Sequence, residues 1–369
     1  MIAVFFTHDV SLELWEKRGM FSREVRFYQE LAKRVGGVSF FTYGENDDRY
    51  RDRLGPDIRV FSKRCKCPPS HYALILPFVF RKELRQADAI RIHQVAGALP
   101  ALIAHWLYRK PLMVRAGFQW YRFAKQQGAP WWKLAVLSLV ERMAYRSAKA
   151  IIHTTKADAD FVARRYKIAR EKIHVISNFV DTDLFQPTVS PVILDEPKTS
   201  EVCCLCFIGR LEPQKNVAML LEAMQGVDAK LIVYGEGSLH DELEALARTL
   251  GVNADFRGRI ANEELPRALN DCEIFVLPSL YEGNPKVLLE AMACGRAVIG
   301  TNVDGIRTVI QDGRTGLLCD LNANALHAQI KKVLEDRHLR LRLGAYAREY
   351  TLATASLEHA LQTELPFYS

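Results

Sequence analysis

Two glutamates, Glu282 and Glu290, have seven residues between them and flank a loop, Gly283-Asn284-Pro285, that leads into a predicted helix. The first amides of that helix, those of Lys286 and Val287, would point outward with the positive end of the helix dipole, which suits a phosphate. A carboxylate beside a phosphate repels it unless the carboxylate accepts hydrogen bonds from hydroxyl groups. The pair therefore indicates a ligand with sugar hydroxyls on both sides of its phosphates, which is a nucleotide-sugar. The spacing by itself has an alternative interpretation, in which Glu282 is a solvated loop residue and Glu290 is a surface residue of the helix.

The elements around the two glutamates form a strand–loop–helix–strand unit. The apolar run Ile274–Leu277 predicts a buried parallel strand. Asn284 is a good N-cap and Pro285 suits the first helical position, so the helix is predicted over Pro285–Cys294, with Gly295 ending it. The strand Ala297–Gly300 follows. Loops at the carboxyl ends of such strands are where α/β proteins bind ligands.

A second group of candidate residues follows the predicted strand Val202–Ile208. Gly209 allows a close turn of the backbone, and Arg210 and Lys215 place two cations at one strand end. Two cations there could neutralise a departing diphosphate. The alternative is a pair of surface cations in a turn.

The segment from Glu282 to Glu290, with the AMACG and TNVDGI segments that follow it, resembles the signature of retaining, GT-B-fold glycosyltransferases of family 4. The resemblance is strong over about residues 170–320 and weaker before them. It implies an α/β protein with two Rossmann-like, doubly wound domains that face each other across a cleft. The alternation of strands and helices in both halves agrees with that class.

The resemblance also implies roles for individual residues. Arg210 and Lys215 would stabilise the leaving diphosphate, Glu290 would accept hydrogen bonds from the ribose, and Glu282 would accept them from the donor sugar. The remaining donor-binding positions are Gly19, Gly209, Gly235, Arg259, Ile260, Gly283, Asn284, Lys286 and Val287. Of these, Gly19 is equally well explained as a glycine that ends a helix.

In the first half, His93 ends the predicted strand Ala87–His93 and is the acceptor-side catalytic candidate, although lone histidines are more often structural. Many family members carry a histidine at the end of the next strand, where this chain has Gly117. That departure removes the usual acceptor-side residue. Arg115, two residues earlier, is the candidate to supply a positive charge to the cleft instead.

The 369 residues carry a net charge of +7, which is divided unevenly between the two halves. Residues 1–185 hold 32 Lys and Arg against 18 Asp and Glu, whereas residues 186–369 are acidic. The basic half predicts an anionic partner, such as an acidic membrane surface or a phosphorylated acceptor. No nucleic-acid-binding module accompanies it, so nucleic acid is not expected as a partner.

The chain offers few signals for metals, cofactors or membrane spans. No apolar run approaches the ~20 residues that cross a bilayer. The eight cysteines show no framework spacing and are expected to be reduced cytosolic thiols. No Asp-x-Asp motif stands at the end of a predicted strand, so no metal is expected, and no cofactor beyond the nucleoside-diphosphate sugar donor.

The predicted organisation has an acceptor-binding domain at residues 1–185, a Pro-rich linker at 186–200 and a nucleotide-sugar-binding domain at 201–350. Residues 351–369 are expected to form a helix that returns to the first domain. Residues 118–149 are aromatic and basic. They predict either a helix that docks on a bilayer interface or a long interior helix whose core contacts are Trp132, Leu134, Val136, Leu137 and Leu139.

We therefore expect a retaining glycosyltransferase that moves a sugar from a nucleoside-diphosphate sugar to an acceptor hydroxyl. The acceptor is predicted to be a glycan or a lipid-linked or glycolipid molecule in bacterial surface polysaccharide synthesis. The enzyme would be cytoplasmic and peripheral at the inner face of the membrane. The alternatives are a non-catalytic nucleotide-sugar-binding protein and a GT-B-like nucleotide-sugar epimerase, which would alter the donor without an acceptor.

Overall fold

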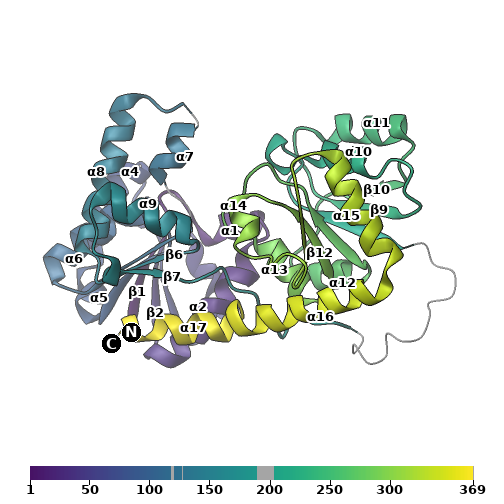
Figure 1. Cartoon of the computed structure of the whole chain (residues 1–369). Coiled ribbons are helices and arrows are strands. Elements are labelled where there is room, and N and C mark those ends of the chain that lie inside the picture. The colour runs from purple at the N-terminus through teal and green to yellow at the C-terminus, as the bar shows by residue number, and fades with distance from the viewer. Residues whose placement is uncertain (118–119, 127, 189–202, 369) are drawn as a thin grey trace. The chain divides into compact units, whose positions relative to one another are not determined.

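The structure is a computed structural model that describes residues 1–117, 120–126, 128–188 and 203–368. Two compact units divide the chain (Figure 1): Met1–Ser177 with Leu361–Ser369 form the first, and Asn178–Ala360 form the second. The division falls a few residues before the expected boundary at 185. Most of the predicted linker, residues 189–200, lies outside the described residues.

The first unit contains a seven-stranded parallel sheet with the order β3-β2-β1-β4-β5-β6-β7. Its strands are β1 Ile2–Phe5, β2 Val38–Phe41, β3 Ile58–Phe61, β4 Ala89–Ile92, β5 Leu112–Ala116, β6 Ala150–His153 and β7 Ile173–Val175. Every residue of β1, β2, β4, β5 and β6 is buried, because helices cover both faces of the sheet. Strands buried on both faces are mostly apolar, and Arg91 of β4 and Arg115 of β5 are charged exceptions.

Helices pack on both faces of this sheet. They are α1 Leu12–Lys17, α2 Phe21–Val35, α3 Arg51–Leu54, α4 Pro69–Val79, α5 Arg81–Gln86, α6 Ala98–Tyr108, α7 Trp120–Gln126, α8 Trp131–Ser147 and α9 Lys156–Tyr166. Helices α4, α6 and α8 share one hydrophobic core with one face of the sheet. Helices α1 and α2 lie on the other face, where Trp15 stacks on Phe6 and Tyr28 contacts Phe40 (Figure 1).

Helix α1 lies in the segment between β1 and α2. Ser11 caps it by accepting a hydrogen bond from the amide of Leu14 at 3.0 Å. At its other end, Gly19 has φ of 65°, its amide donates to Glu16, and the amide of Met20 donates to Trp15. These two bonds form the glycine-terminated motif that commonly ends helices. The geometry of Gly19 is thus explained by the end of the helix.

The second unit contains a six-stranded parallel sheet with the order β10-β9-β8-β11-β12-β13. Its strands are β8 Cys204–Ile208, β9 Lys230–Tyr234, β10 Ala254–Phe256, β11 Ile274–Leu277, β12 Ala297–Thr301 and β13 Leu317–Cys319. Its helices are α10 Val217–Ala223, α11 His240–Leu250, α12 Leu265–Asn270, α13 Lys286–Ala293, α14 Asp304–Arg307, α15 Ala323–Glu335, α16 Arg337–Thr354 and the first part of α17 Leu357–Glu364. The predicted strand Ile274–Leu277 is confirmed.

Helix α13 begins one residue later than predicted. Asn284 does not cap it, because the side-chain oxygen of Asn284 instead accepts a hydrogen bond from the amide of Asn178 at 2.9 Å. Pro285 remains extended and precedes the helix. The helix ends as predicted: Gly295 has φ of 68°, its amide donates to Met292, and the amide of Arg296 donates to Ala291.

The expectation that all eight cysteines are thiols is wrong for one pair. Cys65 and Cys67 form a disulfide in the loop between β3 and α4, where a single intervening residue keeps the two side chains adjacent. The other six cysteines form no disulfide. Within the described residues, no helix is both long and apolar enough to cross a membrane.

Candidate functional site

The carboxyl ends of four neighbouring strands in the second unit carry most of the predicted donor-site residues. Gly209, Arg210 and Lys215 follow β8, Gly235 follows β9, Arg259 and Ile260 follow β10, and residues 282–287 follow β11. Strands β8 and β11 are adjacent although three connections separate them along the chain. They form the point where the strand order changes direction, which is the usual ligand site of an open α/β sheet.

Lys215 and Glu282 meet at this edge of the sheet. The Nζ atom of Lys215 lies 2.5 Å from Oε1 of Glu282, and both side chains are largely buried. The same carboxylate oxygen accepts a hydrogen bond from Oγ of Ser279 at 2.7 Å. Lys215 was predicted to bind a phosphate and Glu282 to bind a sugar hydroxyl, and the two side chains are in contact.

Gln214 joins the loop after β8 to the loop after β11. Its carbonyl accepts from the amide of Leu280 at 2.9 Å, and its side chain donates to the carbonyl of Tyr281 at 2.9 Å. The guanidinium of Arg210, which is exposed, donates to Oε1 of Gln214 at 3.3 Å. The two cations therefore occupy one short loop whose position depends on the loop that carries Glu282.

The glycines after β8 and β9 allow the adjacent loops to touch through their backbones. A Cβ atom added to Gly235 would lie 1.8 Å from the carbonyl oxygen of Gly209. The amide of Gly235 donates to the carbonyl of Gly258 at 2.7 Å, which connects this contact to the loop after β10. Arg259 and Ile260 follow directly, so the structure places the predicted base-binding residues beside the two glycines.

Asn178 holds the loop before α13. It was not among the residues predicted for this site. Its amide and its side-chain nitrogen donate to Oδ1 and to the carbonyl of Asn284, at 2.9 and 2.7 Å. Phe179 lies beneath Nζ of Lys286, 5.1 Å from the ring centre. Asn178 and Phe179 lie within the range 1–185 that was predicted to be the acceptor-binding domain, so a contact with the donor-site loop was not expected.

Gly305 and Thr301 support the same loop from the following strand and helix. A Cβ atom on Gly305 would lie 2.3 Å from the carbonyl oxygens of both Glu282 and Gly283. Thr301 is fully buried and donates to the carbonyl of Ser279 at 2.6 Å. Both residues belong to the TNVDGI segment, which was already part of the family resemblance. Their contacts with the backbone of the loop that carries Glu282 are visible only in the tertiary structure.

Glu290 lies on α13, one helical turn after Lys286, and its side chain is buried, with 2% of its surface exposed. Val287 is half-buried at the start of the same helix. An eight-residue helix that begins at Lys286 therefore carries both the predicted phosphate-binding amides and the predicted ribose-binding carboxylate.

In the first unit, His93 follows β4 and is half-buried. Its Nδ1 atom lies 2.7 Å from the hydroxyl of Tyr28, and its ring packs against Trp15 with a centroid distance of 5.0 Å. The histidine is thus held in a defined orientation. Gly117 follows β5, and its amide donates to Oε1 of Gln94, the residue after His93, at 2.8 Å.

The expectation for Arg115 is wrong. Its side chain is buried on the face of the sheet that α2 covers, and its Nη1 atom lies 3.1 Å from Oε2 of Glu364. Arg91 of β4 also binds Glu364, through Nε at 2.7 Å, and donates to the hydroxyl of Tyr28 at 2.6 Å. The buried carboxylate of Glu364 therefore neutralises the positive charge that Arg115 was expected to supply to the cleft.

Burial alone would raise the pKa of Glu364. Arg91 and Arg115, with hydrogen bonds from Arg91 and Tyr368, outweigh that effect and leave the pKa of this carboxyl below its ordinary value. Through Arg91 and Tyr28, the same network reaches His93. No group of three or more His, Cys, Asp or Glu that could hold a metal ion occurs in the part of the chain that the structure describes.

Two protein-family models match the chain, one in each half. The model described as Glycosyltransferase Family 4 matches residues 19–184, and the model described as Glycosyl transferases group 1 matches residues 195–350. The chain belongs to glycosyltransferase family 4. The chain is 31% identical over 235 residues to the alpha-maltose-1-phosphate synthase of Mycolicibacterium smegmatis, an alignment that covers 59% of the chain and 60% of that relative.

The chain also matches the alpha-D-kanosaminyltransferase of Streptomyces kanamyceticus over a longer alignment, at 26% identity over 344 residues, which cover 84% of the chain and 88% of the relative. A third relative is the N-acetylgalactosamine-N,N'-diacetylbacillosaminyl-diphospho-undecaprenol 4-alpha-N-acetylgalactosaminyltransferase of Campylobacter jejuni, at 29% identity over 201 residues, with 53% of each chain covered. The chain thus spans little more than half the length of the first and third relatives.

Solved structures show the GT-B fold. Anabaena HepE in complex with UDP superimposes on this chain with a TM-score of 0.78 at 18% identity, covering 99% of this chain and 98% of that one. The sucrose-phosphate synthase of Thermosynechococcus elongatus has a TM-score of 0.74 at 21% identity, covering 100% and 98%. Both units therefore have the Rossmann-like architecture of this fold.

Proposed function

We propose that the protein moves a sugar from a nucleoside-diphosphate sugar to an acceptor hydroxyl and retains the anomeric configuration. The observation that carries the proposal is the contact of Lys215 with Glu282 at the carboxyl edge of the second sheet, where α13 also begins. A cation, a carboxylate and a helix N-terminus at one strand end can bind a diphosphate and a sugar together.

In this mechanism, Arg210 and Lys215 stabilise the leaving diphosphate, with the amides of Lys286 and Val287. An ammonium has three N–H donors, so Lys215 can hold Glu282 and still donate to phosphate oxygens. Oε1 of Glu282 is occupied by Lys215 and Ser279, so Oε2 is the oxygen that accepts from a donor-sugar hydroxyl.

Binding of the nucleoside uses the other residues of the edge. Glu290 accepts from the ribose hydroxyls, and backbone atoms of Arg259 and Ile260 meet the base beside Gly209 and Gly235.

During transfer, the bond from the anomeric carbon to the diphosphate oxygen breaks while the acceptor oxygen bonds to the same face of that carbon. The acceptor proton passes to the departing phosphate oxygen, so no separate base is required. The charge that develops on the diphosphate is stabilised by cations already in place.

The acceptor is proposed to be a lipid-linked or glycolipid molecule used in bacterial surface polysaccharide synthesis. The named activity of the Campylobacter jejuni relative on a diphospho-undecaprenol acceptor supports this class, and so does the excess of cations in residues 1–185. His93, fixed by Tyr28, is proposed to contact the acceptor. The enzyme would act in the cytoplasm, at the inner face of the membrane.

Thermal stabilisation by a panel of UDP, GDP, ADP and CMP and their common sugar conjugates tests donor binding. A ligand at ~100 times its dissociation constant adds roughly 2.7 kcal/mol to the stability of the domain that binds it. One nucleotide should stabilise the protein, and Glu290→Ala should abolish that effect. A protein that none of these ligands stabilises would contradict the proposal.

Turnover then separates transfer from the alternatives. Incubation of the stabilising nucleotide-sugar with acceptor should release the nucleotide and form a glycoside whose anomeric configuration, measured by NMR, equals that of the donor. Conversion of the donor without an acceptor would instead indicate an epimerase.

A further inference from the structure

Helices α4, α6 and α8 expose an unusual amount of apolar surface for one face of a domain. Among the described residues, eighteen large hydrophobic side chains are strongly exposed, and eleven of them belong to these three helices. They include Phe78 and Val79 of α4, Trp106 and Leu107 of α6, and Trp132 and Val136 of α8. Helix α6 packs against both α4 and α8, so the three helices are neighbours, and we call their exposed sides the α4/α6/α8 face.

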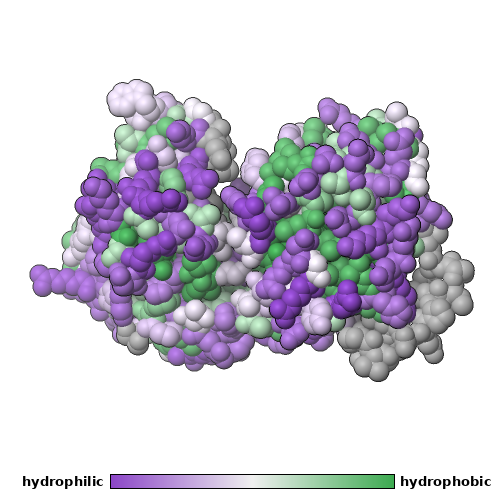
Figure 2. Space-filling view, viewed as in Figure 1, coloured by the Kyte–Doolittle hydropathy of each residue, from purple (hydrophilic) through white to green (hydrophobic). Residues whose placement is uncertain are grey.

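Helix α8 shows that the apolar residues are not core contacts. Trp132, Val136 and Leu139 have spacings that place them on one side of a helix, and they are 58%, 54% and 56% exposed. Leu137 is the residue of this helix that is buried in the core as predicted. The prediction of core contacts is therefore wrong for Trp132, Val136 and Leu139, and hydrophobic residues reach the surface where α8 lies (Figure 2).

The same face carries cations and almost no accessible acid. Helices α4 and α6 contain no Asp or Glu, and the one carboxylate of α8, Glu141, is fully buried and bonds to the hydroxyl of Tyr166. Lys133 and Arg142 of α8 are exposed beside the apolar side chains. On α9, Asp158 and Asp160 are each paired with an arginine. The face is thus apolar and positively charged.

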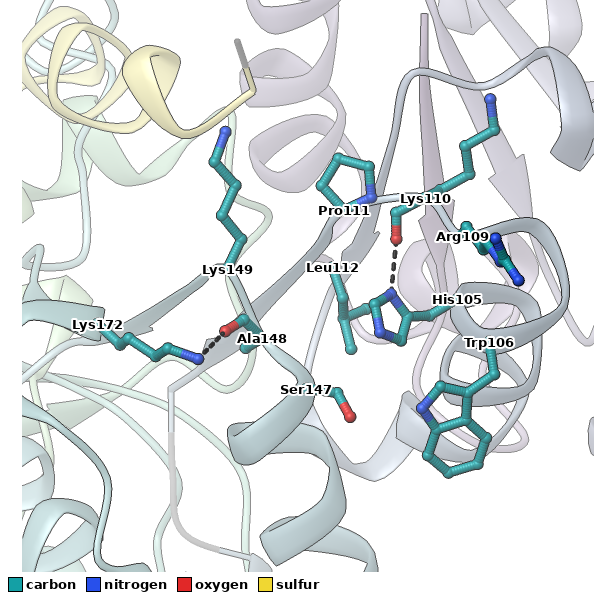
Figure 3. A pocket seen from close by; sticks show the side chains of 10 residues that line it. All are labelled: His105, Trp106, Arg109, Lys110, Pro111, Leu112, Ser147, Ala148, Lys149 and Lys172. Carbon is teal, nitrogen blue, oxygen red and sulfur yellow. Dashed lines mark hydrogen bonds between the residues drawn. The ribbon is translucent and has the colours of Figure 1, made fainter.

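A cavity of about 580 Å³ lies beside this face, where α6 and α8 end (Figure 3). Trp106 lines it together with Arg109, Lys110, Lys149 and Lys172, and no carboxylate contributes to its wall. Lys172 donates to the carbonyl of Ala148 at 3.2 Å, whereas the side chains of Lys110 and Lys149 extend away from the ribbon. The cavity places further cations at the edge of the apolar surface.

We propose that the α4/α6/α8 face docks on a bilayer that contains anionic lipids. Tryptophans beside lysines and arginines suit the boundary between headgroups and acyl chains, where rings bury apolar area and cations meet phosphates. A second copy of the same face would bring like charges together, which disfavours self-association. The inference goes beyond glycosyl transfer and does not depend on it, because lipid binding requires no donor.

Vesicle co-sedimentation of the full chain tests this face. The protein should bind vesicles of phosphatidylcholine with about a third phosphatidylglycerol, and bind pure phosphatidylcholine far more weakly. Reversal of two charges, Lys133→Glu with Arg142→Glu, should lower the partition coefficient by roughly tenfold or more. The matched control is Arg267→Glu with Arg342→Glu, two exposed arginines of the second unit, and it should retain binding.

The apolar part is tested by Phe78→Ser, Trp106→Ser and Val136→Ser together, one change on each helix. This variant should lose most vesicle binding, while Leu184→Ser with Leu321→Ser and Leu352→Ser, exposed leucines of the second unit, should not. Equal losses in test and control variants would overturn the proposal. The proposal would also be overturned if the protein did not bind anionic vesicles and formed an oligomer, measured by light scattering, that the triple serine substitution on α4, α6 and α8 dissociated.

Discussion

Nζ of Lys215 lies 2.5 Å from Oε1 of Glu282, although 67 positions separate them in the sequence. The contact exists because β8 and β11 are neighbours in the sheet and both residues follow the carboxyl ends of these strands. Lys215 thus has a fixed position before any donor arrives, which lowers the cost of organising charge around a leaving diphosphate.

Replacement of Lys215 by methionine should lower kcat by about 10²–10³, because it removes one preorganised donor to the leaving group. Steady-state kinetics with donor and acceptor measure this. Lys331→Met is the matched control, since Lys331 forms an exposed ion pair with Glu335 on α15, and it should leave kcat unchanged. A Lys215→Met enzyme with ordinary turnover would exclude the proposed role.

Gly305→Ala should impair the enzyme through the backbone of Glu282 and Gly283, whose carbonyl oxygens leave no room for a methyl group. We expect at least a tenfold loss of kcat/KM, since small displacements of catalytic groups are costly. In Gly313→Ala, the added Cβ has no neighbour within 4 Å, and only its φ of 73° is strained. That control should lose some stability but retain activity, and a similar loss of kcat/KM in both variants would contradict the explanation.

Glu364→Gln should destabilise the first unit by about 3–5 kcal/mol, because it leaves Arg91 and Arg115 buried without their carboxylate. All five tryptophans lie in the first unit, so urea unfolding followed by tryptophan fluorescence reports on this unit. The control Glu13→Gln breaks an exposed ion pair with Lys17 in the same unit and should cost far less. Equal effects would show that the network contributes little.

Acid should destabilise the first unit through His153. Burial lowers the pKa of this histidine to about 4, against opposing effects of Asp158 and of a hydrogen bond to Ala116. The unfolded chain binds the proton more readily, so stability is complete above the unfolded pKa of about 6.5 and falls as pH decreases towards 4. The difference corresponds to about 3 kcal/mol.

Urea titrations between pH 7 and pH 4 on the wild type and His153→Gln measure this effect. The glutamine variant should show a flatter dependence of the free energy of unfolding on pH. Since burial also lowers the pKa of His174, some slope should remain in the variant. Identical slopes in the two proteins would exclude His153 as the acid-sensitive group.

Strands of the second unit and the loops at their carboxyl ends could be predicted from sequence alone. Ile274–Leu277 is confirmed because a strand buried on both faces is continuously apolar, and Gly295 because a left-handed helix end favours glycine. Residues at the ends of parallel strands must share one edge of the sheet, so the grouping of Arg210, Lys215 and Glu282 also followed from their order along the chain.

Other features depended on contacts between distant segments. Arg115 looked like a cleft cation until Glu364, from the chain end, was found to neutralise it in the core. Asn284 looked like a helix cap, but its side chain binds Asn178. The sequence did not determine whether Trp132 and Val136 are exposed, because the same helical spacing is found on a face packed in a core and on a face that meets solvent. Local pattern determines which backbone elements form, whereas the pairing of buried charges and the side of a helix that meets solvent are decided by what the tertiary fold places beside them.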